Sequence, residues 1–251
     1  MRLDVAFTPA GLAAGEVAAR TVFVIDVLRA STTICAALAH GARGVIPVPS
    51  IEEAMKLAQT LDRGEVLLAG ERHCVRIAGF HLGNSPREMT DATVRGKTLV
   101  MNTTNGTRAL LATAGAAQVY VAAGVNLSAA GARAREVLTT SDDLLVVCAG
   151  REGAFSLDDA YAAGRLLLWA LDGRRPRRGL NDAAMVSLDL ARRHGSRWLR
   201  PLMASRAGQE LVGLGYRDDV ADAAHEDRYP VLPRFADRRI AIEVPEREAT
   251  P

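Results

Sequence analysis

The stretch FVIDVLRASTT (residues 23–33) begins as a buried strand and turns abruptly polar. Its first residues are continuously apolar, which is typical of a strand covered on both faces of a parallel sheet. Asp26, Arg29 and three hydroxyls, those of Ser31, Thr32 and Thr33, then follow within eight positions. Ligands of such sheets bind at the carboxyl ends of the strands. We therefore predict that this stretch is a strand-to-helix junction at a ligand-binding edge.

Apolar runs alternate with helical patterns along most of the chain. Strands are predicted at 2–6, 21–27, 44–48, 65–69, 97–101, 118–122 and 144–149, and at 239–244 on a sheet edge. Helices are predicted at about 31–40, 51–62, 105–114, 127–139, 157–171, 181–194 and 202–214. Ser50 with Glu53, and less ideally Ser156 with Asp159, resemble capping boxes. The pattern predicts an α/β fold with three layers, α/β/α, around a mostly parallel, mixed sheet.

Composition limits the class of protein. The 251 residues, 49% of them hydrophobic, suffice for one large α/β domain or two small ones, and we expect a single domain over 1–251. The net charge of +2 gives no broad basic field, so nucleic acid is not an expected partner. Three scattered cysteines indicate neither a disulfide nor a zinc site. No leader and no run of 18 apolar residues is present, which predicts a cytoplasmic protein without membrane contact.

Two segments of the chain resemble each other. VIDVLRASTTICAALAHGARGVIPV matches VMNTTNGTRALLATAGAAQVYVA, with Asp26 aligned to Asn102 and Ser31 to Thr107. LLAGER (67–72) then matches VCAGRE (147–152) in the same order. One interpretation is a duplicated βαβ-type unit, with copies at 21–88 and 97–171 and a more divergent part at 180–251. The other is that any two alanine-rich βαβ units look alike.

The second junction, MNTTNGTRAL (101–110), has the composition of an anion-binding turn. Gly106 permits a tight turn, the following helix presents free N–H groups, and Arg108 adds a guanidinium. The short polar donors are Asn102, Thr103, Thr104, Asn105 and Thr107. A well-capped turn is the structural alternative. These side chains exceed what one cap needs, so we predict that the turn binds an anionic substrate.

At the first junction, Ser31 or Thr32 can cap the helix and Arg29 can supply a second anion contact. Asp26 ends a buried strand, and an unpaired buried carboxylate is costly. Its partner is either Arg29, in a purely structural pair, or a divalent cation.

Acidic loops follow two further strands. Glu71 and Arg72 end one strand, and Arg151 and Glu152 follow another. Asp158 and Asp159 stand in the first turn of a helix, where dipole complementarity explains one of them. Carboxylates at several strand ends, close to anion-binding turns, are the ingredients of a magnesium-assisted phosphoryl-transfer site.

The loop GFHLGNSPREM (79–89) contributes further candidates. Asn84 can orient a substrate or cap a helix, and His73 and His81 are candidate acids or bases, although either can equally be an ordinary surface histidine.

Four segments in order, VIDVLRASTTI, GERHCVRIAGFHLGNSPREM, TTNGTRAL and CAGREGAFSLDDAYAAG, together resemble the 2-phosphosulfolactate phosphatase family over about residues 21–171. The resemblance implies a magnesium-dependent α/β phosphatase that cleaves 2-phospho-3-sulfolactate to sulfolactate and phosphate on a route toward coenzyme M. Members also occur where coenzyme M is not expected, so the pathway need not carry over. His73 and Cys74 stand where the family usually has small residues.

With that resemblance, the predicted partner is a small anionic phosphorylated substrate, and a homo-oligomer is compatible with such an enzyme. The predicted Mg²⁺ ligands are Asp26, Glu71, Glu152 and Asp159. The predicted catalytic residues are Asp26, Arg151 and Glu152. The predicted substrate-binding residues are Arg29, Ser31, Thr32, Arg72, Asn84, Asn102, Thr103, Thr104, Asn105, Gly106, Thr107 and Arg108.

Two alternatives stay open. A haloacid-dehalogenase-type phosphatase would need an acid two positions after Asp26, where the chain has Leu28. A non-catalytic anion-binding or regulatory protein on the same scaffold would need the arginines and amides but not the carboxylates.

Overall fold

The computed structural model describes residues 2–13, 15–62, 64–140, 143–174 and 179–242. In these residues ten strands form one sheet in the order β1-β8-β2-β7-β9-β10-β3-β6-β4-β5. The first parallel group comprises β1 (Arg2–Ala6), β8 (Asp143–Cys148), β2 (Thr21–Ile25) and β7 (Gln118–Ala122). The second parallel group comprises β3 (Gly44–Pro47), β6 (Thr98–Asn102) and β4 (Val66–Arg72). The sheet is open and mostly parallel, which confirms the predicted α/β class.

An antiparallel hairpin joins the two parallel groups and reverses the strand direction. It consists of β9 (Pro233–Ala236) and β10 (Arg239–Ile242). β9 also pairs antiparallel with β7, and β10 with β3, so three reversals separate the groups. The strands of the second group therefore run opposite to those of the first. The prediction that the C-terminal strand lies on a sheet edge was wrong, because β10 is an interior strand between β9 and β3.

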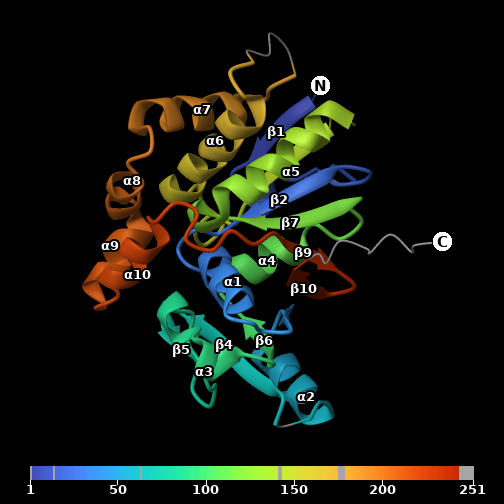
Figure 1. The fold of residues 1–251 in the computed structure, drawn as a ribbon, viewed down its shortest axis with the longest axis vertical. Coiled ribbons are helices and arrows are strands. Elements are labelled where there is room, and N and C mark those ends of the chain that lie inside the picture. The colour runs from blue at the N-terminus through green and yellow to red at the C-terminus, as the bar shows by residue number, and fades with distance from the viewer. Residues whose placement is uncertain (1, 14, 63, 141–142, 175–178, 243–251) are drawn as a thin grey trace, which may run out of the picture.

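The two segments that resemble each other, 21–88 and 97–171, exchange one strand: each inserts a strand between two strands of the other. β2 lies between β7 and β8, and β6 lies between β3 and β4. Segments 21–88 and 97–171 each supply strand, helix, strand, helix and strand in the same order, apart from short additional elements and a long helix, Leu157–Leu171, that ends the second segment. This exchange places the helices after β2 and β6 between the two groups, where α1 (Ala30–Ala39) and α4 (Gly106–Leu111) lie in Figure 1. The duplication itself stays a prediction.

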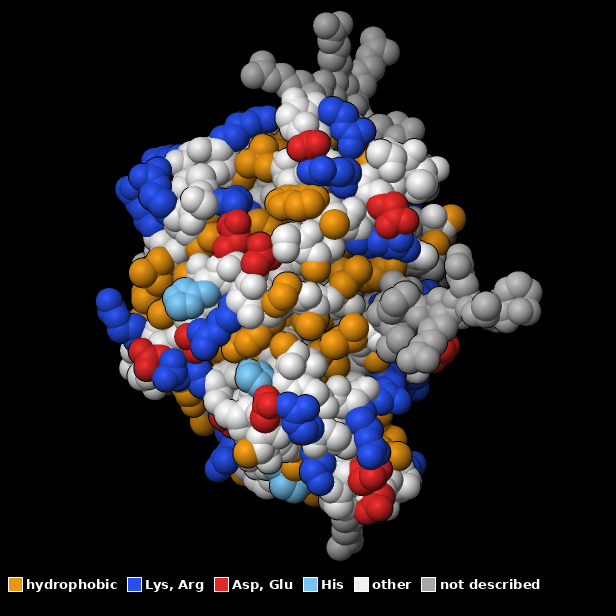
Figure 2. Space-filling model, viewed as in Figure 1, with side chains coloured by type: hydrophobic (Ala, Val, Ile, Leu, Met, Phe, Trp, Pro, Cys, Tyr) orange, Lys and Arg blue, Asp and Glu red, His pale blue; other side chains and the backbone are white. Residues whose placement is uncertain are grey.

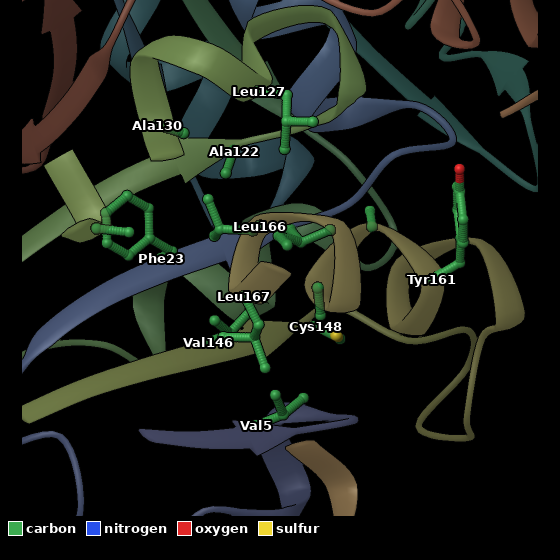
Figure 3. Close-up of a cluster of buried hydrophobic side chains, with 14 of the residues drawn as sticks. Val5, Phe23, Ala122, Leu127, Ala130, Val146, Cys148, Tyr161, Leu166 and Leu167 are labelled. Atoms are coloured by element: carbon green, nitrogen blue, oxygen red, sulfur yellow. The ribbon is translucent and has the colours of Figure 1, made fainter. Parts of the chain in front are cut away.

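Helices cover the sheet from both sides. On one face of the first group, α5 (Leu127–Thr140) and α6 (Leu157–Leu171) pack on Phe23 of β2 and Val146 of β8 (Figure 3). α7 (Asp182–His194) packs on α6. α1 and α4 cover the other face, and α2 (Ile51–Thr60) covers the second group from outside. Because aromatic residues are few, alanine, valine and leucine side chains fill most of these cores.

Other elements depart from the predicted pattern. The helix predicted at 202–214 is two helices, α8 (Leu199–Ala204) and α9 (Arg206–Gly213), because Ser205 ends the first and caps the second. Ser50 accepts from the Glu53 N–H as predicted, whereas Ser156 makes no cap hydrogen bond. The sequence did not reveal α10 (Arg217–Ala223), α3 (Asp91–Val94), β5 (Val75–Arg76) or β9. Short 3-10 turns are also present at Pro9–Gly11, Pro86–Glu88 and Gly124–Asn126.

Basic and acidic side chains are interspersed over the face shown in Figure 2, in keeping with the small net charge. Within the described ranges, none of the helices combines the length and the apolar character that crossing a membrane requires.

Gly164 sets the close approach of α6 and α7. A β-carbon at this position would overlap the Ser187 carbonyl and lie 2.9 Å from Ala191 Cβ. We expect Gly164→Ala to lower the free energy of unfolding by about 1–3 kcal/mol through overpacking, as measured by urea denaturation. Gly213→Ala is the control, since a β-carbon there meets no atom within 4 Å. Equal stability of the two variants would contradict the close packing.

Candidate functional site

Loops that follow the strands of both parallel groups meet at one cavity. Eight of the predicted site residues line it: Asp26, Arg29, Glu71, Asn84, Thr104, Asn105, Arg151 and Glu152. Leu28, His73 and Cys74 complete the lining. The other predicted residues, Ser31, Thr32, Arg72, Asn102, Thr103, Gly106, Thr107, Arg108 and Asp159, lie outside this lining. The two junctions recognised in the sequence therefore face the same space, although their strands belong to groups of opposite direction.

Asp26 is a buried carboxylate directly after β2. Its Oδ1 accepts a long hydrogen bond of 3.4 Å from the Ala30 N–H, and its own N–H donates to Ser31 Oγ at 2.9 Å. Burial, together with the nearby charges of Asp158 and Glu71, raises the pKa of Asp26 to about 7, and the opposing effects of the Ala30 N–H and Arg29 are smaller. Asp26 can therefore exchange a proton near neutral pH.

Gly106 packs against this carboxylate. A β-carbon at Gly106 would lie 2.7 Å from Asp26 Oδ2 and 2.6 Å from Ala30 Cβ. Both distances are shorter than real β-carbon contacts, so a glycine is needed there for close approach. The contact joins the two junctions directly.

The polar groups of the turn 102–107 are mostly bonded within the protein. Thr103 and Thr107 exchange hydrogen bonds between their hydroxyls and backbone N–H groups at 3.0 Å. The Thr104 N–H donates to Glu71 Oε1 at 2.8 Å, and Glu71 Oε2 accepts from the Cys74 N–H at 2.8 Å. The carboxylate of Glu71 is thus the anion that this turn holds in the structure.

Three further residues predicted to bind substrate, Asn102, Arg72 and Thr32, bond within the protein instead. Asn102 donates to the Val48 carbonyl at 2.6 Å and accepts from Arg72. The Thr32 hydroxyl donates to the Val27 carbonyl at 2.8 Å. Arg108 is exposed on α4.

Asp159 bridges the ends of two strands through hydrogen bonds. Its oxygens accept from the Val27 N–H at 2.9 Å and the Gly150 N–H at 3.0 Å, which follow β2 and β8. The neighbouring Asp158 accepts from the Ser156 hydroxyl at 2.5 Å. Burial raises the pKa of both carboxyls, and for Asp159 the charges of Asp158 and Asp26 add to the effect. Asp26, which lines the cavity, therefore forms a cluster of three buried acids with Asp158 and Asp159.

Acids from the C-terminal helices hold the two cavity arginines. Arg29 donates to Asp219 of α10 at 2.6 Å and to the Cys74 carbonyl at 2.7 Å, and its guanidinium lies 4.4 Å from the centre of the Tyr216 ring. Ser85 Oγ donates to the second oxygen of Asp219 at 2.7 Å. Arg151 pairs with Glu210 of α9.

Sequence reasoning missed Asp219 and Glu210. The cost of burying Arg29 signals that it needs an acid. Nothing in the spacing tells which acid, because Asp219 lies 190 residues away along the chain.

A hard cation such as Mg²⁺ takes one or two carboxylates and keeps several waters. Among the described residues, no group of three or more His, Cys, Asp or Glu side chains is arranged to hold a metal ion. The cavity does offer Asp26 and the buried Asn84 Oδ1, which has no hydrogen-bond partner within the described ranges. The oxygens of Glu71 and Asp159 are engaged by N–H groups. Two oxygen donors therefore fit a magnesium site completed by water and substrate.

Comparison with known proteins identifies relatives across nearly the whole chain. A family model described as 2-phosphosulpholactate phosphatase matches residues 6–238. A protein of Symbiobacterium thermophilum is 42% identical over 229 residues, which cover 91% of this chain and 97% of that protein. One of Caldanaerobacter subterraneus subsp. tengcongensis is 37% identical, covering 86% and 88%. One of Thermotoga maritima is 36% identical, covering 92% and 94%. All three are named probable 2-phosphosulfolactate phosphatase.

The raised pKa of Asp26 predicts a pH-dependent cost in stability. Between about pH 4 and pH 7 the folded chain keeps a proton on Asp26 that the unfolded chain releases, so stability falls as the pH rises through this window. We expect Asp26→Asn to raise the free energy of unfolding by about 1–3 kcal/mol at pH 8, with no gain near pH 4, in urea titrations with EDTA. Asp189→Asn, at an exposed site, is the control. Parallel pH profiles for wild type and Asp26→Asn would contradict the assignment.

Proposed function

The chain belongs to the 2-phosphosulpholactate phosphatase family, and we propose that it is a magnesium-dependent phosphatase that hydrolyses 2-phospho-3-sulfolactate, or a related small phospho-hydroxyacid, to sulfolactate and phosphate. The names of the relatives place the enzyme among the phosphoric monoester hydrolases. The observation that carries the proposal for this chain is Asp26, a buried carboxylate with a pKa of about 7 in a cavity that also holds two arginines.

The charges of the cavity support a requirement for a cation. Asp26, Glu71 and Glu152 line it, whereas the lining arginines, Arg29 and Arg151, are each paired with an acid. A substrate with phosphate, sulfonate and carboxylate groups would meet net negative charge. A magnesium ion held by Asp26 and Asn84 would neutralise part of this charge and polarise the phosphate oxygens.

The side chains of the cavity have separable tasks in this proposal. Without the cation Asp26 holds or releases a proton near neutral pH, whereas a bound cation would keep it a carboxylate, because the positive charge lowers its pKa. Arg29 presents a fixed guanidinium, since Asp219, the Cys74 carbonyl and the Tyr216 ring restrain it. Arg151 supplies a second guanidinium for charge on the phosphate oxygens. Asn105 accepts from the Glu152 N–H at 3.1 Å and so ties the Arg151 loop to the turn after β6.

The two alternatives lack comparable support. Leu28 lines the cavity at the position where a haloacid-dehalogenase-type enzyme needs a second acid. A protein that only binds anions gains nothing from a buried carboxylate that repels them. Asp26, with Asp158 and Asp159 in the same cluster, favours catalysis over simple binding.

Phosphate release from 2-phospho-3-sulfolactate, measured with Mg²⁺ and with EDTA, tests the activity directly. We expect EDTA to abolish it, and we expect Asp26→Asn to lower kcat at least about 10²-fold, because the amide can neither exchange the proton nor offer a carboxylate. The exposed Asp189→Asn variant should keep wild-type kcat. No release from phosphosulfolactate or related phospho-hydroxyacids by the wild-type enzyme would contradict the proposal, and EDTA-resistant release would contradict its metal requirement.

Gly106→Ala tests whether the placement of Asp26 matters apart from its chemistry. The added methyl group must displace Asp26 or Ala30, and a shift of about 1 Å in a reacting group can cost about 10²-fold in rate. We expect kcat to fall by about that factor while Asp26 is retained. Adding Ala30→Gly relieves only one of the two clashes, so the double variant should recover part of the lost stability without recovering kcat. Full activity of Gly106→Ala would show that the contact is unimportant.

A further inference from the structure

We infer that Glu210 is an internal anion that neutralises Arg151 in the free enzyme and that an anionic group of the substrate displaces it. The inference rests on the proposed function, because it describes how the same cavity binds its substrate. Glu210 lies on α9, in the C-terminal part of the chain, away from the strand-end motifs that line the cavity.

Arg151 extends from a tight turn that fixes its backbone. Its N–H and carbonyl both bond to Ala154 at 2.9 Å, and Glu152 and Gly153 between them have positive φ angles of 51° and 80°. These angles are those of a type I′ turn. The turn leaves the side chain as the movable part, and in the described part of the chain its guanidinium pairs with Glu210.

The two arginine pairs of the cavity differ in exposure. The side chains of Arg29 and Asp219 are 3% and 2% exposed, whereas those of Arg151 and Glu210 are 18% and 31% exposed. Separating the first pair would leave a buried charge without a partner, which is strongly unfavourable. Separating the second lets Glu210 turn toward water at little cost, because a partly exposed ion pair is weak. Arg151 is therefore the guanidinium that can change partners.

A second hollow beside Arg151 gives its side chain room to move. It shares Arg151 and Glu152 with the first cavity and is bordered by Phe155, Ser205 and Arg206. When phosphate or sulfonate oxygens replace the Glu210 carboxylate, Arg151 keeps its charge-assisted hydrogen bonds. The substrate is then attracted by the positive charge of Arg151, which Glu210 neutralises in the free enzyme.

The exchange predicts that removing Glu210 improves binding. We expect Glu210→Gln to bind inorganic phosphate about two- to fivefold more tightly by calorimetry, the factor that a partly exposed ion pair is worth. KM should fall by a similar factor with kcat within about twofold of wild type. Methanesulfonate serves as a second probe, and whichever anion gains affinity identifies the substrate group that meets Arg151. A purely structural glutamate would not raise affinity when replaced.

Glu226→Gln is the matched control. Glu226 pairs with Arg165; the Arg165 side chain is 14% exposed and that of Glu226 is 34% exposed. Neither residue lines the cavity. Its replacement changes the net charge equally, so equal tightening by both variants would reveal a long-range charge effect and overturn the inference. In an Arg151→Ala background, Glu210→Gln should have no effect on binding. Glu210→Asp, which shortens the reach to Arg151, serves if Glu210→Gln fails to fold.

The outcomes separate this inference from the proposed function. If a folded Glu210 variant binds both probes no more tightly than wild type, Glu210 does not compete with the substrate. Such a result would leave the proposed phosphatase function untouched. Tighter binding without any turnover of phosphosulfolactate would support the competition and contradict the proposed reaction.

Discussion

The contact between the Asp26 carboxylate and Gly106 is the constraint on which the rest of the site depends. It joins the junction after β2 to the junction after β6, although the two strands run in opposite directions in different parts of the sheet. The β9–β10 hairpin links the two parallel groups into one sheet through three antiparallel pairings. A side chain larger than glycine would separate the junctions and displace the carboxylate that the cavity is built around.

Electrostatics then divides the acids of the site into two classes. Glu71 and Asp159 have their oxygens engaged by N–H groups of neighbouring loops, so they stabilise the arrangement of strand ends. From the described residues Asp26 accepts only one long hydrogen bond, and its pKa is raised, so its charged form is poorly compensated inside the protein. A cation or a proton is the natural complement of such a group. The fold thus maintains an unfavourable charge at the position where chemistry on a phosphate would use it.

Local patterns in the sequence predict the strand ends well, because apolar runs and polar junctions are properties of neighbouring residues. The strand ends that they mark do bring Asp26, Glu71, Thr104 and Arg151 to one cavity. They fail where partners are distant: Asp219 and Glu210 come from helices whose position depends on the packing of the whole domain. They also overestimate the free donors of a junction, since Ser31 and Thr32 bond to backbone groups at the strand end. Likewise, β10 is interior only because β9, which the pattern missed, pairs beside it.

The two junctions occupy corresponding places but perform different tasks. Asn102, aligned with Asp26, is fully buried and tied to the Val48 carbonyl and Arg72, so it fixes the second junction instead of facing the cavity. The turns further along also correspond: His73 and Cys74 have positive φ angles, as do Glu152 and Gly153. At the first turn the Cys74 carbonyl restrains Arg29, and from the second Arg151 extends toward Glu210. One half of the cavity therefore holds its guanidinium rigidly while the other leaves its guanidinium able to change partners, and under the proposed function this difference would orient an asymmetric substrate.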